Sequence, residues 1–388
     1  MDLAAWDKGP DNRWAFQHIG EIIPTAVVSR GDGPATTLAV RPADLMSLTL
    51  ERGETEVTVG DVLRSTYTDG LIVLADGEIV HEEYFNGMGP HTHHLLMSVS
   101  KSIVGTLVGV FVADGRVDPD SPIVEHLPEL RSSPGFADAT VRHLLDMSTA
   151  IDFSEEYDDP DSEVAAHERA MGWRGRSPFA ERGLYAFAET IGRANRSPGA
   201  LFHYASINAD VLGWLIERIA GRRFVDVTSD VLWSRLGVDH DALLSVDHRG
   251  SAVVNGGFCL TLRDLARFGQ MILDDGRANG AQIVPHEWLD DIRHHGDNSL
   301  WRPTVYGERW PDGWYRSQWY VTGDDHGSMF AIGVNGQHLW IDPATRAVVV
   351  KLSSMPKSVD EPLTTLAFDA IETIARACPV IDDGHSPP

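Results

Sequence analysis

The chain has 388 residues, of which 43% are hydrophobic and 23% charged, and its formal net charge at pH 7 is −25. A surface with this excess of carboxylates repels phosphate backbones and anionic lipids, so we expect no nucleic acid and no membrane partner. The only two cysteines, Cys259 and Cys378, provide neither a disulfide framework nor a metal-type spacing.

The length exceeds that of one small core, which predicts two structural lobes or one large domain with an insertion. Residues 1–8 lack the basic and apolar segments of a signal peptide, and no apolar run is long enough to span a bilayer. We therefore expect a cytoplasmic protein.

The first predicted elements follow a stretch of about 60 residues that has little periodicity. Residues 71–86 are predicted to form a β-hairpin, because Asp76-Gly77 separates two β-prone runs. A helical stripe of apolar residues then runs from Ile103 to Phe111 and ends near Gly115.

Helical patterns dominate the middle of the chain. Further helices are predicted over residues 141–147, 209–220, 261–273 and 285–292. Thr261 and Asp264 have the spacing of a capping box, and Pro285 stands at the first turn of its helix.

The end of the chain returns to strands and closes with a helix. Predicted strands cover residues 318–321, 329–334, 337–341 and 347–352, with an Asn335-Gly336 turn, and an amphipathic helix covers 363–374. This order predicts an α+β fold with an antiparallel sheet flanked by helices. Residues 1–95 and 296–388 would form the sheet lobe, and residues 96–295 an inserted, mainly helical lobe.

Ser98 and Lys101 are the strongest candidates for catalysis. Positions i and i+3 share one face of a helix, so the Lys101 amine can reach the Ser98 hydroxyl at the start of the helical stripe. A desolvated lysine can remove the proton that makes a serine a poor nucleophile. Ser354 and Lys357 repeat the spacing, but Pro356 between them prevents a helix.

Tyr204 supplies the proton carrier that a serine–lysine site needs for a leaving amine. It stands at the entry to the predicted helix at 209–220. A tyrosine beside a lysine ammonium can have its pKa lowered enough to transfer a proton. A polar helix start and a surface tyrosine are the alternative interpretation of these residues.

The three elements together resemble a known family. Residues 95–102, 202–206 and 334–337 are similar, in this order, to the motifs of serine-reactive hydrolases of the β-lactamase fold. Nearly the whole chain also resembles the 6-aminohexanoate-dimer hydrolases, the nylon-oligomer amidases of that fold. Residues 12–16, 173–174, 255–257 and 339–343 carry this second likeness.

The resemblance implies a role for each catalytic position. Ser98 would be the nucleophile, Lys101 its base and Tyr204 the proton shuttle to the leaving amine. The main-chain N–H groups of Ser98 and Val334 would form the oxyanion hole, which needs no particular side chain. No cofactor and no metal are implied.

The resemblance also implies substrate contacts. Glu168 would bind the substrate ammonium at a position where the subgroup has aspartate, Tyr157 would lie on a mobile loop that closes over the substrate, and Asn255 would line the cleft. Tyr320 falls where the pattern has tryptophan and Asn335 where it has histidine. Because Asn335 carries no charge to hold a substrate carboxylate, β-lactam recognition is disfavoured.

The predicted function is that of a serine amidohydrolase acting on short ω-amino acid oligomers, such as the 6-aminohexanoate dimer, through an acyl-enzyme on Ser98. Three alternatives stay open: a carboxylesterase acting on short-chain esters, a penicillin-binding or β-lactamase activity, and a non-catalytic binding protein. The predicted partner is a small-molecule substrate, and a homodimer is compatible with the chain. The histidines His91, His93 and His94 are expected to lie in a solvated loop rather than to bind a metal.

Overall fold

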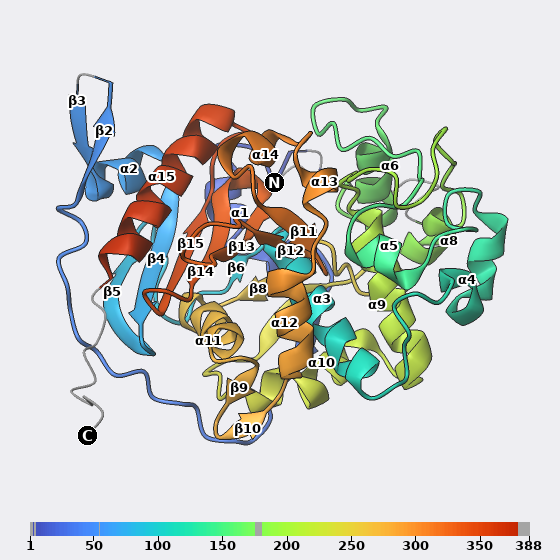
Figure 1. Cartoon of the computed structure of the whole chain (residues 1–388), viewed down its shortest axis with the longest axis horizontal. Coiled ribbons are helices and arrows are strands. Elements are labelled where there is room, and N and C mark those ends of the chain that lie inside the picture. Colours follow the sequence, from blue (N-terminus) through green and yellow to red (C-terminus); the bar gives the residue numbers. More distant parts are fainter. Residues whose placement is uncertain (1–2, 4, 54, 175–180, 379–388) are drawn as a thin grey trace.

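The computed structural model describes residues 3, 5–53, 55–174 and 181–378. Its central element is a seven-stranded antiparallel sheet with the order β11-β12-β13-β14-β15-β4-β5 (Figure 1). These strands are β4 (Thr68–Ala75), β5 (Glu78–Tyr84), β11 (Trp314–Arg316), β12 (Trp319–Val321), β13 (Met329–Gly333), β14 (Gln337–Asp342) and β15 (Ala347–Ser353). The sheet therefore joins a hairpin near the N-terminus to strands near the C-terminus, with β4 paired to β15.

Alternation along the central strands explains why the sheet is covered on both faces. In β4, Ile72 and Leu74 belong to one hydrophobic cluster, whereas Leu71, Val73 and Ala75 belong to the other. All eight residues of β4 are buried. A strand with this pattern needs a helix layer on each side.

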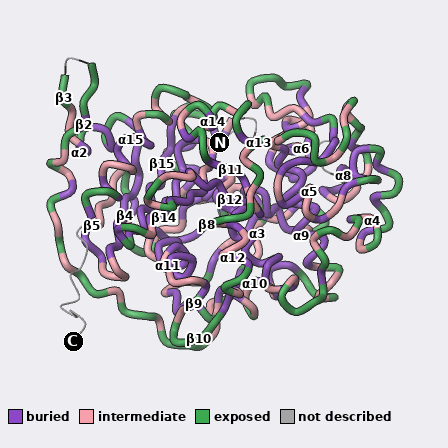
Figure 2. Tube along the Cα trace, in the orientation of Figure 1, coloured by how far each residue is buried: buried purple, intermediate pink, exposed green. Residues whose placement is uncertain are grey.

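Two pairs of helices provide these layers. On one face α15 (Glu361–Ala377) packs on β14 and β15 and contacts α2 (Val59–Ser65). On the other face α11 (Leu262–Leu273) packs on β4, β14 and β15, and α3 (Val99–Ala113) packs on β13. In the burial view of Figure 2 the strands and α3 are mostly buried, and exposed positions are concentrated in the connecting loops.

Helices predominate between α3 and α11 and form the right-hand side of Figure 1. The longest of them, α9, packs against α3, α5 and α10. The elements of this part are α4 (Ile123–His126), η2 (Pro128–Ser132), α5 (Val141–Leu145), α6 (Glu163–Ala170), α8 (Leu184–Ala188), α9 (Ile207–Ala220), α10 (Phe224–Val231) and η3 (Trp233–Arg235).

A second sheet, which the sequence patterns did not predict, has the order β1-β7-β8-β6. Its strands are β1 (Thr25–Val28), β6 (His94–Leu95), β7 (Ala242–Ser245) and β8 (Phe258–Leu260). The remaining short elements are α1 (Asn12–Ala15), η1 (Ile19–Glu21), β2 (Thr49–Arg52), β3 (Thr55–Thr58), β9 (Arg277–Ala278), β10 (Ala281–Gln282), α12 (His286–His294), α13 (Asn298–Trp301), α14 (Val305–Arg309) and η4 (Val334–Gly336).

The predicted hairpin, helices and late strands are all confirmed to within a few residues. Asp76 and Gly77 have φ values of 53° and 80°, as expected for a tight hairpin turn. The α+β architecture is therefore as predicted. The lobe boundaries at 95 and 296 stay a prediction, and α11, which falls inside the range expected for the helical lobe, packs on the sheet.

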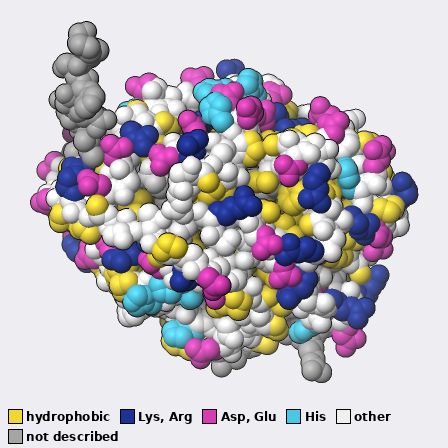
Figure 3. Space-filling view, turned by 90° about the horizontal axis from the view of Figure 1, so that it is seen from below, with side chains coloured by type: hydrophobic (Ala, Val, Ile, Leu, Met, Phe, Trp, Pro, Cys, Tyr) yellow, Lys and Arg dark blue, Asp and Glu magenta, His cyan; other side chains and the backbone are white. Residues whose placement is uncertain are grey.

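Figure 3 shows acidic and basic side chains interspersed on one face, with several lysines and arginines gathered toward its right-hand side. Within the described residues, the helices are all too short or too polar to traverse a bilayer.

Candidate active site

Ser98 and Lys101 lie at the start of α3, with Ser98 at the N-cap position. The Lys101 Nζ is 2.7 Å from Ser98 Oγ and also donates a hydrogen bond to the main-chain oxygen of Asn255, at 2.7 Å. The three-residue spacing thus brings the amine and the hydroxyl into contact, as the sequence predicts. The helix N-terminus adds a positive local field at Ser98.

Lys101 is a buried lysine whose side chain has lost its hydration. The residue is only 1% exposed, and this burial lowers its pKa from 10.5 to about 8. The negative charges of Glu155 and Asp210 oppose the shift. A neutral amine, the form that can accept the Ser98 proton, is therefore populated at mildly alkaline pH.

The turn that carries Ser98 lies directly against the end of β13. Met97 has φ of 47°, an unusual value for a residue with a side chain. A Cβ atom added at Gly333 would fall 2.7 Å from the Leu96 oxygen and 2.9 Å from the Ser98 nitrogen, so only glycine permits this approach. Val334 follows Gly333 and lines the same cavity as Ser98, the arrangement that an oxyanion hole built from both main-chain N–H groups requires.

Tyr204 lies in the same cluster as Ser98 and Lys101. Its ring centroid lies 5.1 Å from Lys101 Nζ, and Ser98 acts on the pKa of its hydroxyl as a hydrogen-bonding neighbour. The expectation of a lowered pKa is wrong, because desolvation of the hydroxyl raises the pKa of Tyr204 well above its usual value, and the Ser98 hydrogen bond only partly opposes this. Tyr204 is therefore present as a neutral phenol, a form that can donate a proton.

Glu155 is a component of this cluster that the sequence analysis did not identify. It accepts hydrogen bonds from the main-chain N–H of Ser206 and, at 2.7 Å, from the Tyr157 hydroxyl. Its charge also acts on Lys101 and Tyr204. Nothing in its sequence context, an acidic loop, distinguishes it from a surface carboxylate, since only the fold brings it here.

Asp210 on α9 fixes the position of Asn255. Its carboxylate accepts hydrogen bonds from the main-chain N–H groups of Val254 and Asn255, at 2.9 and 3.0 Å, and from the Asn255 side chain, at 2.7 Å. His167 Nε2 lies 2.8 Å from the same carboxylate. Asp210 thereby holds the Asn255 carbonyl that accepts from Lys101.

A small cavity of about 20 Å³, partly open to solvent, adjoins Ser98. Three of the residues predicted to contact substrate, Tyr157, Glu168 and Asn255, belong to its wall. Its lining residues are Asp7, Met97, Ser98, Tyr157, Val164, His167, Glu168, Met171, Trp173, Ser206, Asn255, Gly256, Val334 and Ser358.

Glu168, expected to bind a substrate ammonium, already has a partner in the protein. Arg174 Nε donates to Glu168 Oε2 at 2.8 Å, and the two terminal nitrogens of Arg174 donate to the Asp7 carboxylate at 2.8 and 2.6 Å. Burial raises the pKa of the Glu168 carboxyl, and the positive charge of Arg174 opposes this. No motif or periodicity identified Asp7, which lies in the weakly patterned N-terminal segment.

Tyr320 and Asn335 are not among the residues that line the cavity. Tyr320 is buried in an aromatic cluster and stacks on Phe330, with ring centroids 4.9 Å apart. The Asn335 side chain donates to the main-chain oxygens of Met355, at 2.8 Å, and Asp7, at 3.3 Å. In this structure both side chains have partners within the protein, and a substrate contact of either one stays a prediction.

The histidines that precede Ser98 do not share one solvated loop environment. His94 is completely buried, with Nε2 3.1 Å from Asp69 Oδ2, which corrects the expectation for this residue. His91 is exposed and its Nδ1 lies 2.9 Å from Nε2 of His240. Within residues 3–378, excluding the undescribed positions, no group of three His, Cys, Asp or Glu side chains is arranged to hold a metal ion.

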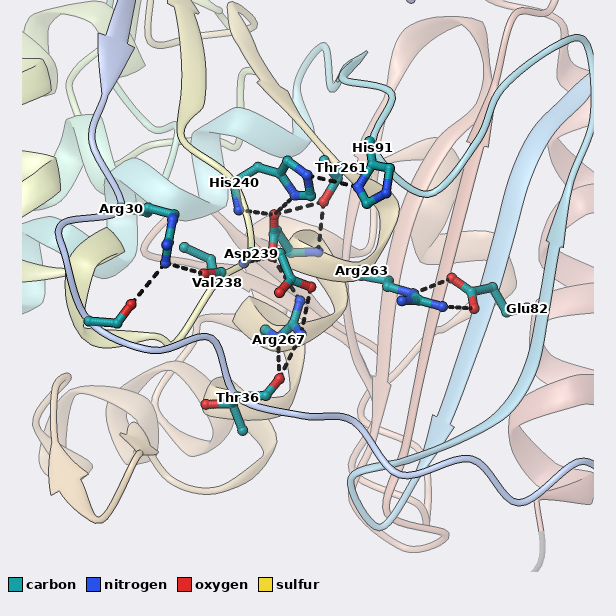
Figure 4. A network of polar contacts seen from close by, with 12 residues as sticks. Arg30, Thr36, Glu82, His91, Val238, Asp239, His240, Thr261, Arg263 and Arg267 are labelled. Atoms are coloured by element: carbon teal, nitrogen blue, oxygen red, sulfur yellow. Dashed lines mark hydrogen bonds and ion pairs between the residues drawn. The ribbon is translucent and has the colours of Figure 1, made fainter.

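The polar network around His240 is centred on α11 (Figure 4). Thr261 caps this helix as predicted, since its hydroxyl accepts from the Asp264 N–H. The return bond of a capping box is absent, because the Asp264 carboxylate accepts instead from the main-chain N–H groups of Asp239 and His240. Arg267 lies 2.9 Å from both Asp264 and Asp239, so this network is occupied by its own internal pairs.

Comparisons with known proteins agree with this geometry. The sequence model of the β-lactamase family matches residues 58–371. The 6-aminohexanoate-dimer hydrolase of Paenarthrobacter ureafaciens is 41% identical over 354 residues, which are 91% of this chain and 88% of that protein.

Solved structures show the same fold. A candidate 6-aminohexanoate-dimer hydrolase from Bacillus anthracis superposes with a TM-score of 0.86 at 25% identity, covering 97% of this chain and 96% of the other. A family VIII carboxylesterase has a TM-score of 0.59 at 14% identity, covering 81% and 96% of the two chains, and shows likeness of fold alone. From the family match and the extent of the 41% identical relative, the chain belongs to the β-lactamase family.

Proposed function

We propose that this protein is a serine amidohydrolase that cleaves linear amide bonds of short ω-amino acid oligomers, the 6-aminohexanoate dimer among them. The observation that carries the proposal is the 2.7 Å contact of Ser98 Oγ with Lys101 Nζ, with the Tyr204 ring centroid 5.1 Å from the same amine. The likeness to the 6-aminohexanoate-dimer hydrolase of Paenarthrobacter ureafaciens supports the substrate class.

Acylation begins when the neutral Lys101 amine accepts the Ser98 hydroxyl proton. Ser98 Oγ forms a bond to the amide carbon, and the resulting oxyanion accepts hydrogen bonds from the main-chain N–H groups of Ser98 and Val334. Tyr204 donates its proton to the amide nitrogen as the C–N bond breaks, and the Lys101 ammonium returns a proton to the phenolate. The amine product leaves, and an ester on Ser98 remains.

Water then hydrolyses the ester by the reverse proton movements. Lys101 again accepts a proton, now from the attacking water, and Ser98 Oγ recovers a proton as the C–O bond breaks. Glu168 binds the ammonium of the acyl group, Tyr157 and Asn255 contact the substrate from the cavity wall, and no metal or cofactor takes part. We infer a cytoplasmic location and retain the homodimer as a hypothesis that light scattering can test.

A comparison of two substrate classes tests the proposal. Purified protein should hydrolyse the 6-aminohexanoate dimer, detected by liquid chromatography, and Ser98→Ala should lose this activity while its circular dichroism spectrum is unchanged. Turnover of a short-chain nitrophenyl ester without turnover of the dimer would favour the carboxylesterase alternative. Failure of a fluorophosphonate probe to label Ser98 would favour a non-catalytic protein.

A further inference from the structure

Two carboxylates of the cavity wall share one guanidinium. Asp7 and Glu168 both line the cavity that contains Ser98, and both are buried, with exposed fractions of 4% and 8%. Arg174 lies between them and donates to each, yet it is not one of the lining residues. A substrate in the cavity therefore meets the two carboxylates, with the cation behind them.

The N-terminal segment that supplies Asp7 is firmly docked. Trp6 Nε1 donates to the Trp173 oxygen at 2.9 Å, and the two indoles pack edge to face with centroids 5.4 Å apart. Asn12 donates to the Met355 oxygen at 2.7 Å. The family model matches residues 58–371, so Asp7 lies outside the matched part, whereas Glu168 and Ser98 lie within it.

Counting charges shows why Asp7 matters. Without Asp7, the Arg174 guanidinium would neutralise Glu168, and this pair would present no net charge to an ammonium group. With Asp7, two negative charges face one positive charge, and the three groups together have a net charge of −1 on side chains that are nearly buried. An excess charge in such surroundings acts strongly, because little water screens it.

The hydrogen bonds of Arg174 and Glu168 lead to the same conclusion. Arg174 donates through three nitrogens. Its Nε donates to Glu168 Oε2, and its two terminal nitrogens donate to the Asp7 carboxylate. Glu168 Oε1 accepts no hydrogen bond from a described residue, so it is an available acceptor for one of the three donors of an ammonium group. A substrate carboxylate in the same place would meet the net negative charge of these three groups.

We propose that Asp7 and Glu168, bridged by Arg174, form a two-carboxylate site that selects acyl groups ending in an ammonium. The inference rests on the proposed function for the position of the acyl group next to Ser98. It assigns to Asp7 a part in substrate specificity and to Arg174 the part of a spacer that keeps two buried carboxylates together.

Binding of matched ligands tests this assignment without turnover. Isothermal titration calorimetry in a Ser98→Ala background, which lacks the proposed nucleophile, compares 6-aminohexanamide with hexanamide, which differ in the terminal ammonium. The protein with an otherwise wild-type site should prefer the charged ligand, and Asp7→Asn in the same background should lose about tenfold or more of that preference. Asp325→Asn, at a carboxylate that is 86% exposed near Arg376, is the matched control and should retain it.

A double variant separates the charge of Asp7 from its structural contacts. In Asp7→Asn only the ion pair of Glu168 with Arg174 remains, and its net charge is zero. Adding Arg174→Gln leaves Glu168 alone and restores a net charge of −1. The account predicts that the double variant regains preference for 6-aminohexanamide. If Asp7→Asn keeps the wild-type preference, or if the double variant is no better than the single one, the two-carboxylate site is refuted.

This result is independent of the chemistry at Ser98. Near-ultraviolet circular dichroism and the melting temperature of Asp7→Asn report whether the N-terminal segment stays docked. Whether Ser98→Ala loses or keeps activity bears on the proposed function alone. The ligand preference, in contrast, is a binding equilibrium that can be measured in every variant.

Discussion

The burial of Lys101 makes the stability of the protein depend on pH. Its pKa falls from an ordinary value of 10.5 to about 8 in the folded protein. At about 1.4 kcal/mol for each pKa unit, holding the ammonium form in the folded state costs about 3 kcal/mol. Because the folded pKa is the lower of the two, the cost is fully present below pH 8 and disappears as the pH rises toward 10.5.

Lys101→Met isolates this contribution. The substitution removes the titrating group and keeps a side chain of similar length. The lost hydrogen bonds to Ser98 and Asn255 change stability by an amount that depends little on pH. The free energy of unfolding of the wild type, minus that of the variant, should therefore rise by about 2.5 kcal/mol between pH 7 and pH 10.

Urea denaturation followed by tryptophan fluorescence, at constant ionic strength and several pH values, measures this difference. The exposed Lys357, changed to methionine in the same way, controls for the general effect of deleting a lysine. A difference that stays constant from pH 7 to pH 10, or that falls, would refute the claim that Lys101 is held in a desolvated state.

Three further predictions concern the groups around Ser98. Glu155→Gln removes a negative charge that raises the pKa of Lys101, so the acidic limb of the pH profile of kcat/KM should move to lower pH; an unmoved limb contradicts this. Gly333→Ala should lower kcat by about 10²-fold, because the added Cβ displaces the oxyanion hole. Gly89→Ala is the control, since a Cβ there would lie 3.9 Å from its nearest neighbouring atom, and equal rates in both variants would contradict the close approach at Gly333. Asn335→Ala should lower the free energy of unfolding by about 2 kcal/mol and leave the KM of a neutral ester nearly unchanged, whereas a raised KM with full stability would indicate a substrate contact.

Local patterns were sufficient to predict most of the main sheet and the serine–lysine pair. The Asp76-Gly77 turn and the run of β-branched residues in β15 are signals that depend on neighbours in the sequence. The contact of Ser98 with Lys101 needs only one turn of helix. These features are determined within a few residues, so a single sequence contains them.

The rest of the site depends on contacts between distant parts of the chain. The second sheet pairs β1 with β7, and their short strands have no strong alternation. Glu155 and Asp7 become parts of the site only because loops far apart in sequence pack together. The sequence could not predict that the pKa of Tyr204 is raised, because the shift depends on how far burial outweighs the effect of Ser98.

The central claim, that Ser98 becomes acylated with the help of Lys101, is tested most directly by trapping the covalent intermediate. Protein mixed with nitrophenyl 6-aminohexanoate, quenched in acid and digested, should show one added 6-aminohexanoyl group on the peptide that contains Ser98, and Lys101→Met should accumulate almost none. Turnover with the acyl group on another residue, or undiminished acylation in Lys101→Met, would contradict the account.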